Sequence, residues 1–541
     1  MNFTIPRSVE QFCLDVQAVA ARSGRSEALQ MVVELARVTS TSEMAIATVL
    51  SSRPIDAACQ ELGRTTAAVD VFDPEQSVFL VTALSRSGGH TRVLREVIDV
   101  DPGKRSTVLV TNVLHQVELD DIRQAFGDAS VDIQIAPAGM ALGDTVDWVQ
   151  ERLLKLRAER TYILQHHFDA VVSASVQPSL VKQLYYLHNC DHSFALGVHL
   201  PHAVHVDLHG PGFHVCRERE GIRGNVCWPL TAGPREQIGQ GFGEMVQRTC
   251  TAGGREKFDT SHLIERVPYL LTYPETVRTI LATTGGVHHH IGALPAALSA
   301  AIASELDAHG IGRERFVHTE FVPNLSHYMV ENGIELYVTS MPWGGGRTLV
   351  EMMATGLPIL IHSNYRSMLL TDQCSAYPEA LTWRSYEELA ARLRQFSRAV
   401  LQRQSEAALA FYQRHHQTEA LRSAVERTLR GESLPEPAAP TYTPDAMQTF
   451  LDLHAARLDH VWVTASDLAR REAQIRELEQ AFRMAETLAL ERLAEMARLD
   501  KQLILTDQAL NAVTGLVHQR DAEIIRLQEQ LREKVAARPT A

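Results

Sequence analysis

The chain has 541 residues and a formal net charge of −13 at pH 7, with 52 basic and 65 acidic side chains. This length predicts two globular domains with extensions, because a single hydrophobic core rarely grows so large. The negative charge argues against nonspecific nucleic-acid binding, and seven scattered cysteines without a Cys-x-x-Cys pair argue against a zinc finger or a disulfide framework.

Residues 1–70 are predicted to form a helical cap. Apolar residues recur there with the 3.6-residue period of a helix, as in 12–19 and 29–36. The alternative use of this cap is an acceptor-docking module. Its first twelve residues lack the apolar core of a signal peptide, and the longest apolar stretch of the chain, near 293–303, is too short to span a bilayer. We therefore expect a cytoplasmic protein.

Residues 71–250 are predicted to form a first Rossmann-like domain, in which strands and helices alternate. Such alternation predicts a parallel sheet with helices on both faces. A glycine loop follows the first strand and contains Gly88, Gly89 and His90. The strands are expected at 78–82, 107–111, 132–135 and 170–173, and the helices at 93–96, 118–126 and 144–159.

Residues 251–430 are predicted to form a second Rossmann-like domain. Two such halves that face a cleft place ligands at the carboxyl ends of their strands. A strand at 277–283 is expected to lead through Gly285 and Gly286 into a histidine run at 288–290. The other strands are expected at 315–318, 334–338 and 359–361, and the helices at 294–308, 347–355, 386–400 and onward to 429.

The segment 341–362 carries the most specific pattern in the chain. Glycines let the backbone turn tightly and approach a ligand, and the helix that follows offers free N–H groups that suit a phosphate. An acid one turn into this helix can reach a sugar hydroxyl. The spacing is neither that of a dinucleotide fingerprint nor that of a P-loop. The residues concerned are Gly344, Gly345, Gly346, Arg347, Thr348 and Glu351.

This segment resembles the donor-nucleotide site of GT-B glycosyltransferases, with the likeness strongest over 270–430. It is most similar to bacterial group-1-like transferases and to the cytoplasmic transferases that modify adhesins. The resemblance implies that 344–348 hold the diphosphate of a nucleotide sugar and that Glu351 contacts the ribose. Retaining group-1-like members carry a second Glu eight residues earlier, where this chain has Trp343. That departure favours an inverting displacement.

Gly88 and Gly89 of the first glycine loop are also expected to contact the donor. Two further cations are expected at the diphosphate. The resemblance places His290 there, and Lys257 would add a permanent positive charge. The run 288–290 is not predicted to bind a metal, because three consecutive imidazoles cannot readily face one ion. The resemblance implies no resident cofactor and no metal, only the donor as substrate.

His90, Asp191 and His192 are the predicted catalytic residues. His90 would contact the acceptor or the transferred sugar, or else cap its loop. Asp191 and His192 lie in a His-x-x-Asp-His-x-Phe-x-Leu-Gly run that also resembles the adhesin-type transferases. An Asp can orient an imidazole and raise its basicity, as a general base requires. The alternative is a buried hydrogen-bonded pair that joins two strands. The histidines at 202–214 are expected to be mostly structural.

The C-terminal part is predicted to be a Pro-rich linker at 431–445 and a helical coiled coil over 446–541. From 475 to 531 a 3,4 spacing defines 17 seam positions, of which 14 are apolar. A seven-residue repeat sustained over this length predicts supercoiling and a homo-oligomer.

These patterns together predict a metal-independent, inverting transferase of the hexosyl type. Its donor would be a UDP- or GDP-linked sugar, and its acceptor a glycan, a lipid-linked molecule or a protein. Two alternatives stay open. One is a GT-B-fold epimerase or phosphorylase. The other is a non-catalytic scaffold or assembly protein that acts through its coiled coil.

Overall fold

The computed structural model describes residues 8–42, 45–84, 89–114, 126, 131–189, 191–239, 241–258, 269, 271–440 and 465–536. Two compact units divide the chain, Met1–His454 and Ala455–Ala541. Expectations for Gly88, for most of the helix at 118–126 and for residues 441–464 lie outside the described residues.

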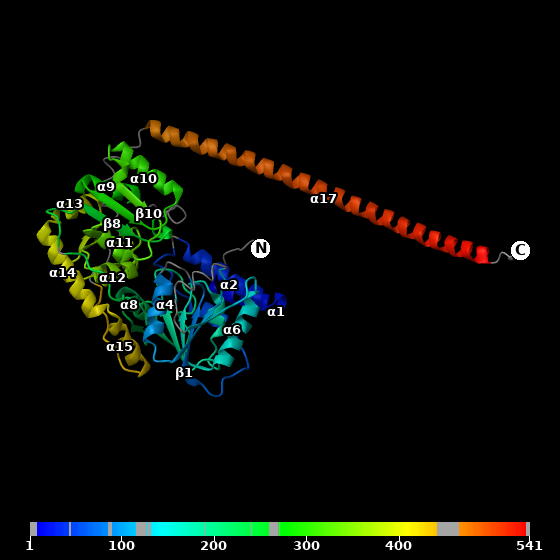
Figure 1. The fold of residues 1–541 in the computed structure, drawn as a ribbon, viewed down its shortest axis with the longest axis horizontal. Coiled ribbons are helices and arrows are strands. Elements are labelled where there is room, and N and C mark those ends of the chain that lie inside the picture. Colours follow the sequence, from blue (N-terminus) through cyan, green and yellow to red (C-terminus); the bar gives the residue numbers. More distant parts are fainter. Residues whose placement is uncertain are drawn as a thin grey trace. The chain divides into compact units, whose positions relative to one another are not determined.

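The first half of unit 1 is built on a parallel sheet in the order β3-β2-β1-β4-β5-β6-β7. Helices cover both of its faces (Figure 1). The strands are β1 (Asp73–Val81), β2 (Arg105–Val110), β3 (Val131–Ile135), β4 (Ala158–Leu164), β5 (Gln183–His188), β6 (Ala203–Asp207) and β7 (Val226–Cys227). The helices of this half are α4 (Gly89–Val100), α6 (Leu142–Leu156), α7 (Ala170–Ser175) and α8 (Gly210–Glu218).

The N-terminal helices pack against α6 and α7 of this first half. They are α1 (Val9–Ser23), α2 (Arg25–Ser40) and α3 (Arg53–Leu62). Phe12 and Leu29 share one buried core with Val78 and Leu109 of the sheet. Burial of such large side chains contributes about 2 kcal/mol each. The helices predicted within residues 1–70 are confirmed, and their apolar stripes form part of the first core.

The second half of unit 1 is built on a parallel sheet in the order β10-β9-β8-β11-β12-β13. Its strands are β8 (Arg248–Ala252), β9 (Val287–Ile291), β10 (Phe316–Thr319), β11 (Leu336–Val338), β12 (Ile359–His362) and β13 (Leu381–Trp383). Its helices are α9 (Tyr273–Thr284), α10 (Ala296–Ala308), α11 (Leu325–Glu331), α12 (Gly346–Thr355), α13 (Tyr386–Gln395) and α14 (Arg398–His415). Short 3₁₀ turns are η1 (Arg255–Lys257), η2 (Arg313–Arg315), η3 (Met368–Leu370) and η4 (Gln373–Ser375). The predicted fold class, two Rossmann-like α/β halves, is confirmed.

Helix α15 (Thr418–Leu429) follows the second half but packs against the first. Leu421 and Val425 are buried in the same core as Phe79 of β1. The Trp228 indole N–H donates to Thr428 Oγ1 at 2.9 Å. The two halves are therefore joined at the end of the fold as well as by the chain between β7 and β8.

Two predicted elements of the first half differ from the structure, and one strand was not predicted. Residues 170–173 are not a strand but the start of α7, where Asp169 accepts the N–H groups of Val171 and Val172 as an N-cap. All of α7 is buried, and a short buried apolar run has no periodicity that separates helix from strand. The predicted helix 144–159 ends at Leu156, and Ala158 begins the central strand β4, which the sequence reading missed.

In the second half, residues 277–283 are not a strand but part of α9. Thr272 Oγ1 accepts the N–H of Glu275, Pro274 stands in the first turn, and Gly285 ends the helix in the left-handed region. This Thr-x-x-Glu capping box was a readable signal, but the β-branched residues behind it favoured a strand. The histidine run 288–290 consequently lies within strand β9 and not in a loop after a strand.

The described part of the linker lies against the first half. His214 Nε2 donates to the Pro437 carbonyl at 3.0 Å, and Arg217 pairs with Glu436. These contacts attach the start of the linker to α8.

Unit 2 contains one long helix, α17 (Ala465–Ala536), drawn in orange and red in Figure 1. Its seam side chains Leu503 and Leu510 are 67% and 61% exposed. Self-association through this apolar row stays a prediction. In the part of the chain that the structure describes, no helix combines the length and apolarity needed to cross a membrane.

Candidate functional site

Polar side chains lie at the carboxyl ends of the strands of the first sheet. Helix α4 follows β1 and carries His90 in its first turn, and His166 follows β4. Asp191 and His192 follow β5, and His209 follows β6. Because these strands are parallel, the segments that follow them meet at one edge.

The buried Asp191 and the half-buried His209 form a close pair at these strand ends. His209 Nε2 lies 2.6 Å from Asp191 Oδ2, and His209 Nδ1 accepts the N–H of Gly212. Burial alone lowers the pKa of His209, but the Asp191 carboxylate outweighs it and raises that pKa. Burial likewise opposes ionisation of Asp191, yet His209 brings its pKa below the usual value. The pair is therefore a charged one, with the proton on the imidazole.

His192 faces the second half from the same loop. Its Nδ1 lies 4.0 Å from Asp191 Oδ1, and its ring centroid lies 5.8 Å from that of Trp343. Burial lowers the pKa of His192 despite the nearby Asp191, and the charge of Lys257 lowers it further. A neutral imidazole next to a carboxylate is the form that can accept a proton.

Three more histidines lie beside His192. Burial, together with the neighbouring imidazoles, lowers the pKa of His90 and of His166 to about 4 and that of His167 to about 2. The ring centroids of His166 and His167 lie 4.1 Å apart. His90 was predicted from the sequence, but His166 and His167 were missed. The signal that would have found them is their position directly after β4, the strand that was missed.

Across from these histidines lies the glycine turn that precedes α12. The N–H of Gly344 donates to the Leu370 carbonyl, and the N–H of Gly345 donates to Asp372 Oδ2. Lys257 donates to the Gly344 carbonyl. A Cβ on Gly344 would clash with the Asp372 carboxylate, and one on Gly345 with Lys257 Nζ. Gly344 therefore lies against the Asp372 carboxylate, and Gly345 lies against the flexible end of Lys257.

Asp372, which was not predicted from the sequence, places a carboxylate at the glycine turn. It is 9% exposed, and burial raises the pKa of its carboxyl although Lys257 acts in the opposite direction. Its carboxylate accepts the hydrogen bond from the Gly345 N–H, at the position where an anionic ligand was expected. The N–H groups of Gly346, Arg347 and Thr348 in the first turn of α12 have no acceptor among the described residues.

Glu351 lies one turn into α12 and is held by arginines. Its carboxylate accepts from Arg92 Nη1 and from Arg235 Nε, each at 3.0 Å, and lies 3.6 Å from Arg347 Nη1. Arg92 belongs to α4, so this network joins the two halves. Arg347 Nη2 also bonds Glu96 of α4 at 2.7 Å. The carboxylate that was expected to contact a ribose is thus 5% exposed and already bonded to cations.

A cavity of about 480 Å³ opens beside this network. Its volume suits a small-molecule ligand. Arg347 Nε and Nη1 are buried donors without a hydrogen-bond acceptor among the described residues. Gly89 lies close to Arg347, since a Cβ built on Gly89 would stand 3.9 Å from the Arg347 Cβ. The charged residues that line the cavity are Arg92, Arg95, Glu96, Asp99, Arg235, Arg347 and Glu351.

His290 does not lie with these residues as a cation. It is fully buried within β9, its Nδ1 is 2.6 Å from the hydroxyl of Tyr273, and burial lowers its pKa to about 3. Its neighbour His289 points to the other side of the strand, with Nδ1 2.9 Å from the hydroxyl of Tyr328. The expected placement of His290 after a strand is therefore wrong, because the run itself is a strand.

The structure thus brings together two groups of predicted residues. His90, Asp191 and His192 gather at the edge of the first sheet. Lys257 and the glycine turn lie opposite, since the charge of Lys257 acts on His192 and that of Asp372 acts on His209. Gly88 lies outside the described residues.

No protein-family model matches the chain, and no curated protein matches it by sequence. Among solved structures it is similar to a Thermobaculum terrenum O-GlcNAc transferase mutant, with 13% identity, TM-score 0.44, and coverage of 78% of this chain and 83% of that one. Anabaena HepE in complex with UDP and glucose shares 11% identity at TM-score 0.45, over 65% of this chain and 99% of its own. A putative UDP-N-acetylglucosamine 2-epimerase from Listeria monocytogenes shares 10% at TM-score 0.42, over 68% and 100%. These similarities concern the fold alone.

Proposed function

We propose that this protein is a GT-B-type glycosyltransferase that moves a sugar from a nucleoside-diphosphate sugar to an acceptor nucleophile. The observation that carries the proposal is the pairing of two sites within one compact unit. A lysine and a glycine turn at a helix start stand on one side, and a neutral histidine beside a carboxylate stands on the other.

The donor diphosphate is proposed to bind at the start of α12. The first N–H groups of that helix, Lys257 and the free donors of Arg347 supply hydrogen bonds and positive charge. Asp372 must leave the Gly345 N–H before a phosphate oxygen can take its position. Ligand binding at the turn is thus an exchange of one anion for another.

The ribose is proposed to lie in the cavity next to Glu351. Three arginines hold the Glu351 carboxylate. Besides contacting the ribose, Glu351 keeps the charges of these arginines oriented toward the cavity. His290 takes no part in the proposed site, because it is buried and bonded to Tyr273.

The transfer step is proposed to be an inverting displacement with His192 as general base. His192 removes the proton of the acceptor as its oxygen or nitrogen attacks the anomeric carbon. The bond to the diphosphate breaks, and Lys257 with the α12 amides stabilises the charge that leaves. Asp191 positions His192 and stabilises the imidazolium that forms. His90 contacts the transferred sugar or the acceptor.

Several finer features complete the proposal. The donor is a hexose linked to UDP or GDP, and the acceptor is a glycan, a lipid-linked molecule or a protein. The protein acts in the cytoplasm as a homo-oligomer joined through residues 475–531. No metal takes part in the transfer, because cationic side chains and helix amides neutralise the leaving diphosphate.

Slow donor hydrolysis, with water as the acceptor, tests this proposal without knowledge of the natural acceptor. Each nucleoside-diphosphate sugar is incubated with the protein, and the released nucleoside diphosphate is measured. We expect His192→Gln to lower release by about 10²-fold with donor affinity unchanged. The exposed His309→Gln serves as the matched control. Equal release by wild type and His192→Gln would contradict the assigned base.

A non-catalytic scaffold is the second candidate, and one observation favours it. The Gly345 N–H and the Glu351 carboxylate are both engaged by the chain itself. A protein of this kind would bind no nucleotide and release none in the same assay.

A further inference from the structure

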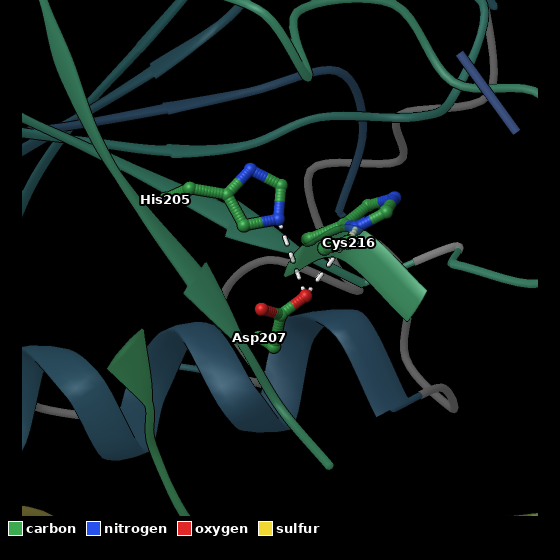
Figure 2. A group of neighbouring side chains, drawn as sticks. His205, Asp207 and Cys216 are labelled. Carbon is green, nitrogen blue, oxygen red and sulfur yellow. Dashed lines mark hydrogen bonds and ion pairs between the residues drawn. The ribbon is translucent and has the colours of Figure 1, made fainter. Parts of the chain in front are cut away.

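Four buried side chains with metal-binding donor atoms meet in the first half. They are His188, His205, Asp207 and Cys216, and their donor atoms all lie within 4.8 Å of one another. None is more than 3% exposed. Figure 2 shows His205 and Asp207 facing each other, with Cys216 close by. The proposed transfer uses none of these residues.

The backbone explains why these residues meet. His205 and Asp207 are two positions apart on β6, so both point to the same side of the sheet. His188 ends β5 and stands directly beside Asp207 in the parallel register. Cys216 lies in α8, which begins three residues after β6 and returns across this face. Three neighbouring elements therefore deliver four donors to one point.

Three of the distances between donor atoms are close to those around a tetrahedral ion. His205 Nε2 lies 3.2 Å and His188 Nδ1 lies 3.6 Å from Asp207 Oδ1, and Cys216 Sγ lies 3.3 Å from His188 Nδ1. Four ligands at bonds of about 2.0–2.3 Å, arranged tetrahedrally, stand roughly 3.3–3.6 Å apart.

We propose that His188, His205, Asp207 and Cys216 bind one divalent transition-metal ion, and that Zn²⁺ is the ion they fit best. Two imidazoles, one carboxylate and one thiolate form the mixed nitrogen, oxygen and sulfur set that zinc accepts. All four positions are protein donors, so no position is open to water or substrate. The site is therefore structural.

Binding is balanced by the loss of one proton. The Cys216 S–H bond breaks as the sulfur–metal bond forms, and the proton leaves to water. The two ring nitrogens that face the centre bind as unprotonated donors. Asn225 Nδ2 donates to the outer oxygen of Asp207 at 2.7 Å and so orients the carboxylate toward the ion.

The ion would stabilise the elements that carry the proposed base. Strand β5 leads directly to Asp191 and His192, and α8 begins next to His209, the partner of Asp191. A bond network between β5, β6 and α8 fixes the distance between these segments.

Elemental analysis of the full-length, tag-free protein by plasma mass spectrometry tests the proposal. We expect about one zinc per chain in the wild type and less than about one tenth in Cys216→Ala. Cys250→Ala is the matched control, because Cys250 is equally buried but lies in β8 of the other half. It should retain the metal. Wild-type protein without metal, or a Cys216→Ala variant that keeps it, would overturn the proposal.

A second measurement uses only the wild type, in case the variant does not fold. The metal is removed with a chelator and replaced with Co²⁺. A tetrahedral site with one thiolate gives intense visible d–d bands and a sulfur-to-cobalt charge-transfer band in the near ultraviolet. We also expect Zn²⁺ to raise the melting temperature of the metal-free protein, because an ion that binds only the native state stabilises it. Absence of both the charge-transfer band and the shift would contradict the site.

Discussion

At the scale of single residues, the Asp191–His209 pair makes stability depend on pH. The pKa of His209 is raised above its usual 6.5, so its contribution is complete below pH 6.5 and is lost as pH rises through the raised value. The pKa of Asp191 is lowered below 3.8, so its contribution is present above that pH and is lost in stronger acid. The pair therefore stabilises most between these two values.

We accordingly predict that Asp191→Asn lowers the free energy of unfolding by about 3 kcal/mol at pH 5.5, and by less at a second pH above the raised pKa of His209. Urea unfolding at the two pH values measures the difference. The control is Asp307→Asn, which removes an exposed pair with Arg313 and should change little at either pH. An equal loss at both pH values for Asp191→Asn would show that the two groups are not a charged pair.

Removal of the Asp372 charge is predicted to increase the affinity for the ligand. Its carboxylate occupies the Gly345 N–H and would repel a phosphate there. Like charges about 4 Å apart near a protein surface repel by roughly 4 kcal/mol. Asp372→Asn should therefore tighten nucleoside-diphosphate binding at least about tenfold, as measured by calorimetry. Weaker binding would mean that Asp372 contacts the ligand favourably. Asp15→Asn, on the exposed face of α1, should have no effect.

Some residues of this site could be read from the sequence because each stands in a local pattern. Gly345 lies in a turn between a strand and a helix, and Asp191 with His192 follows a strand. Asp372 and Arg235 could not be found in this way. They reach the glycine turn and Glu351 from loops 27 and 116 positions away, and only the fold brings them there.

At the scale of elements, the glycine turn before α12 is the most constrained segment. The φ angle of Gly345 is −144°, so an alanine there is limited by contact with Lys257 Nζ and not by backbone strain. Gly345→Ala should displace the lysine and weaken nucleotide binding about tenfold, since a charge-assisted hydrogen bond contributes about 1.5–3 kcal/mol.

The melting temperature of Gly345→Ala should stay close to that of the wild type, because the side chain it displaces is flexible. Gly224→Ala is the control, since nothing lies within 4 Å of the added methyl group. If both variants bind nucleotide equally well, the turn does not hold the ligand.

The elements that could be predicted are those with clear ends. The bounds of α12 agree with the sequence because Gly346 opens the helix and Gly356 closes it in the left-handed region. The sequence of α7 does not distinguish helix from strand, because its six buried residues show neither period. Strand β4 was absorbed into the preceding helix, because no proline or glycine separates Leu156 from Ala158.

At the scale of the whole molecule, the two halves of unit 1 are tied by charge and by α15. Arg92 and Glu96 of α4 bond Glu351 and Arg347 of α12. The alternation of strands and helices was enough to predict two Rossmann-like halves. It could not predict that α15 packs on the first half, because that contact joins segments more than 300 residues apart.

The exposed seam of α17 predicts self-association. Leu503→Glu would place a charge in the apolar row, so we expect a smaller molar mass by light scattering after size-exclusion chromatography. Leu505→Glu is the matched control, because Leu505 is similarly exposed but lies off the seam. If the two variants have the same mass as the wild type, the helix does not mediate assembly.

The start of α12 and Lys257 are proposed to hold a nucleoside diphosphate. The most direct measurement is calorimetric titration of wild type, Lys257→Met and Lys182→Met with UDP, GDP, ADP and CMP and their sugar conjugates. Lys182 is exposed and paired with Glu159 on the opposite edge of the first sheet. We expect one nucleoside diphosphate to bind wild type and Lys182→Met alike, and to bind Lys257→Met at least about tenfold more weakly. No binding of any nucleotide to the wild type would contradict it.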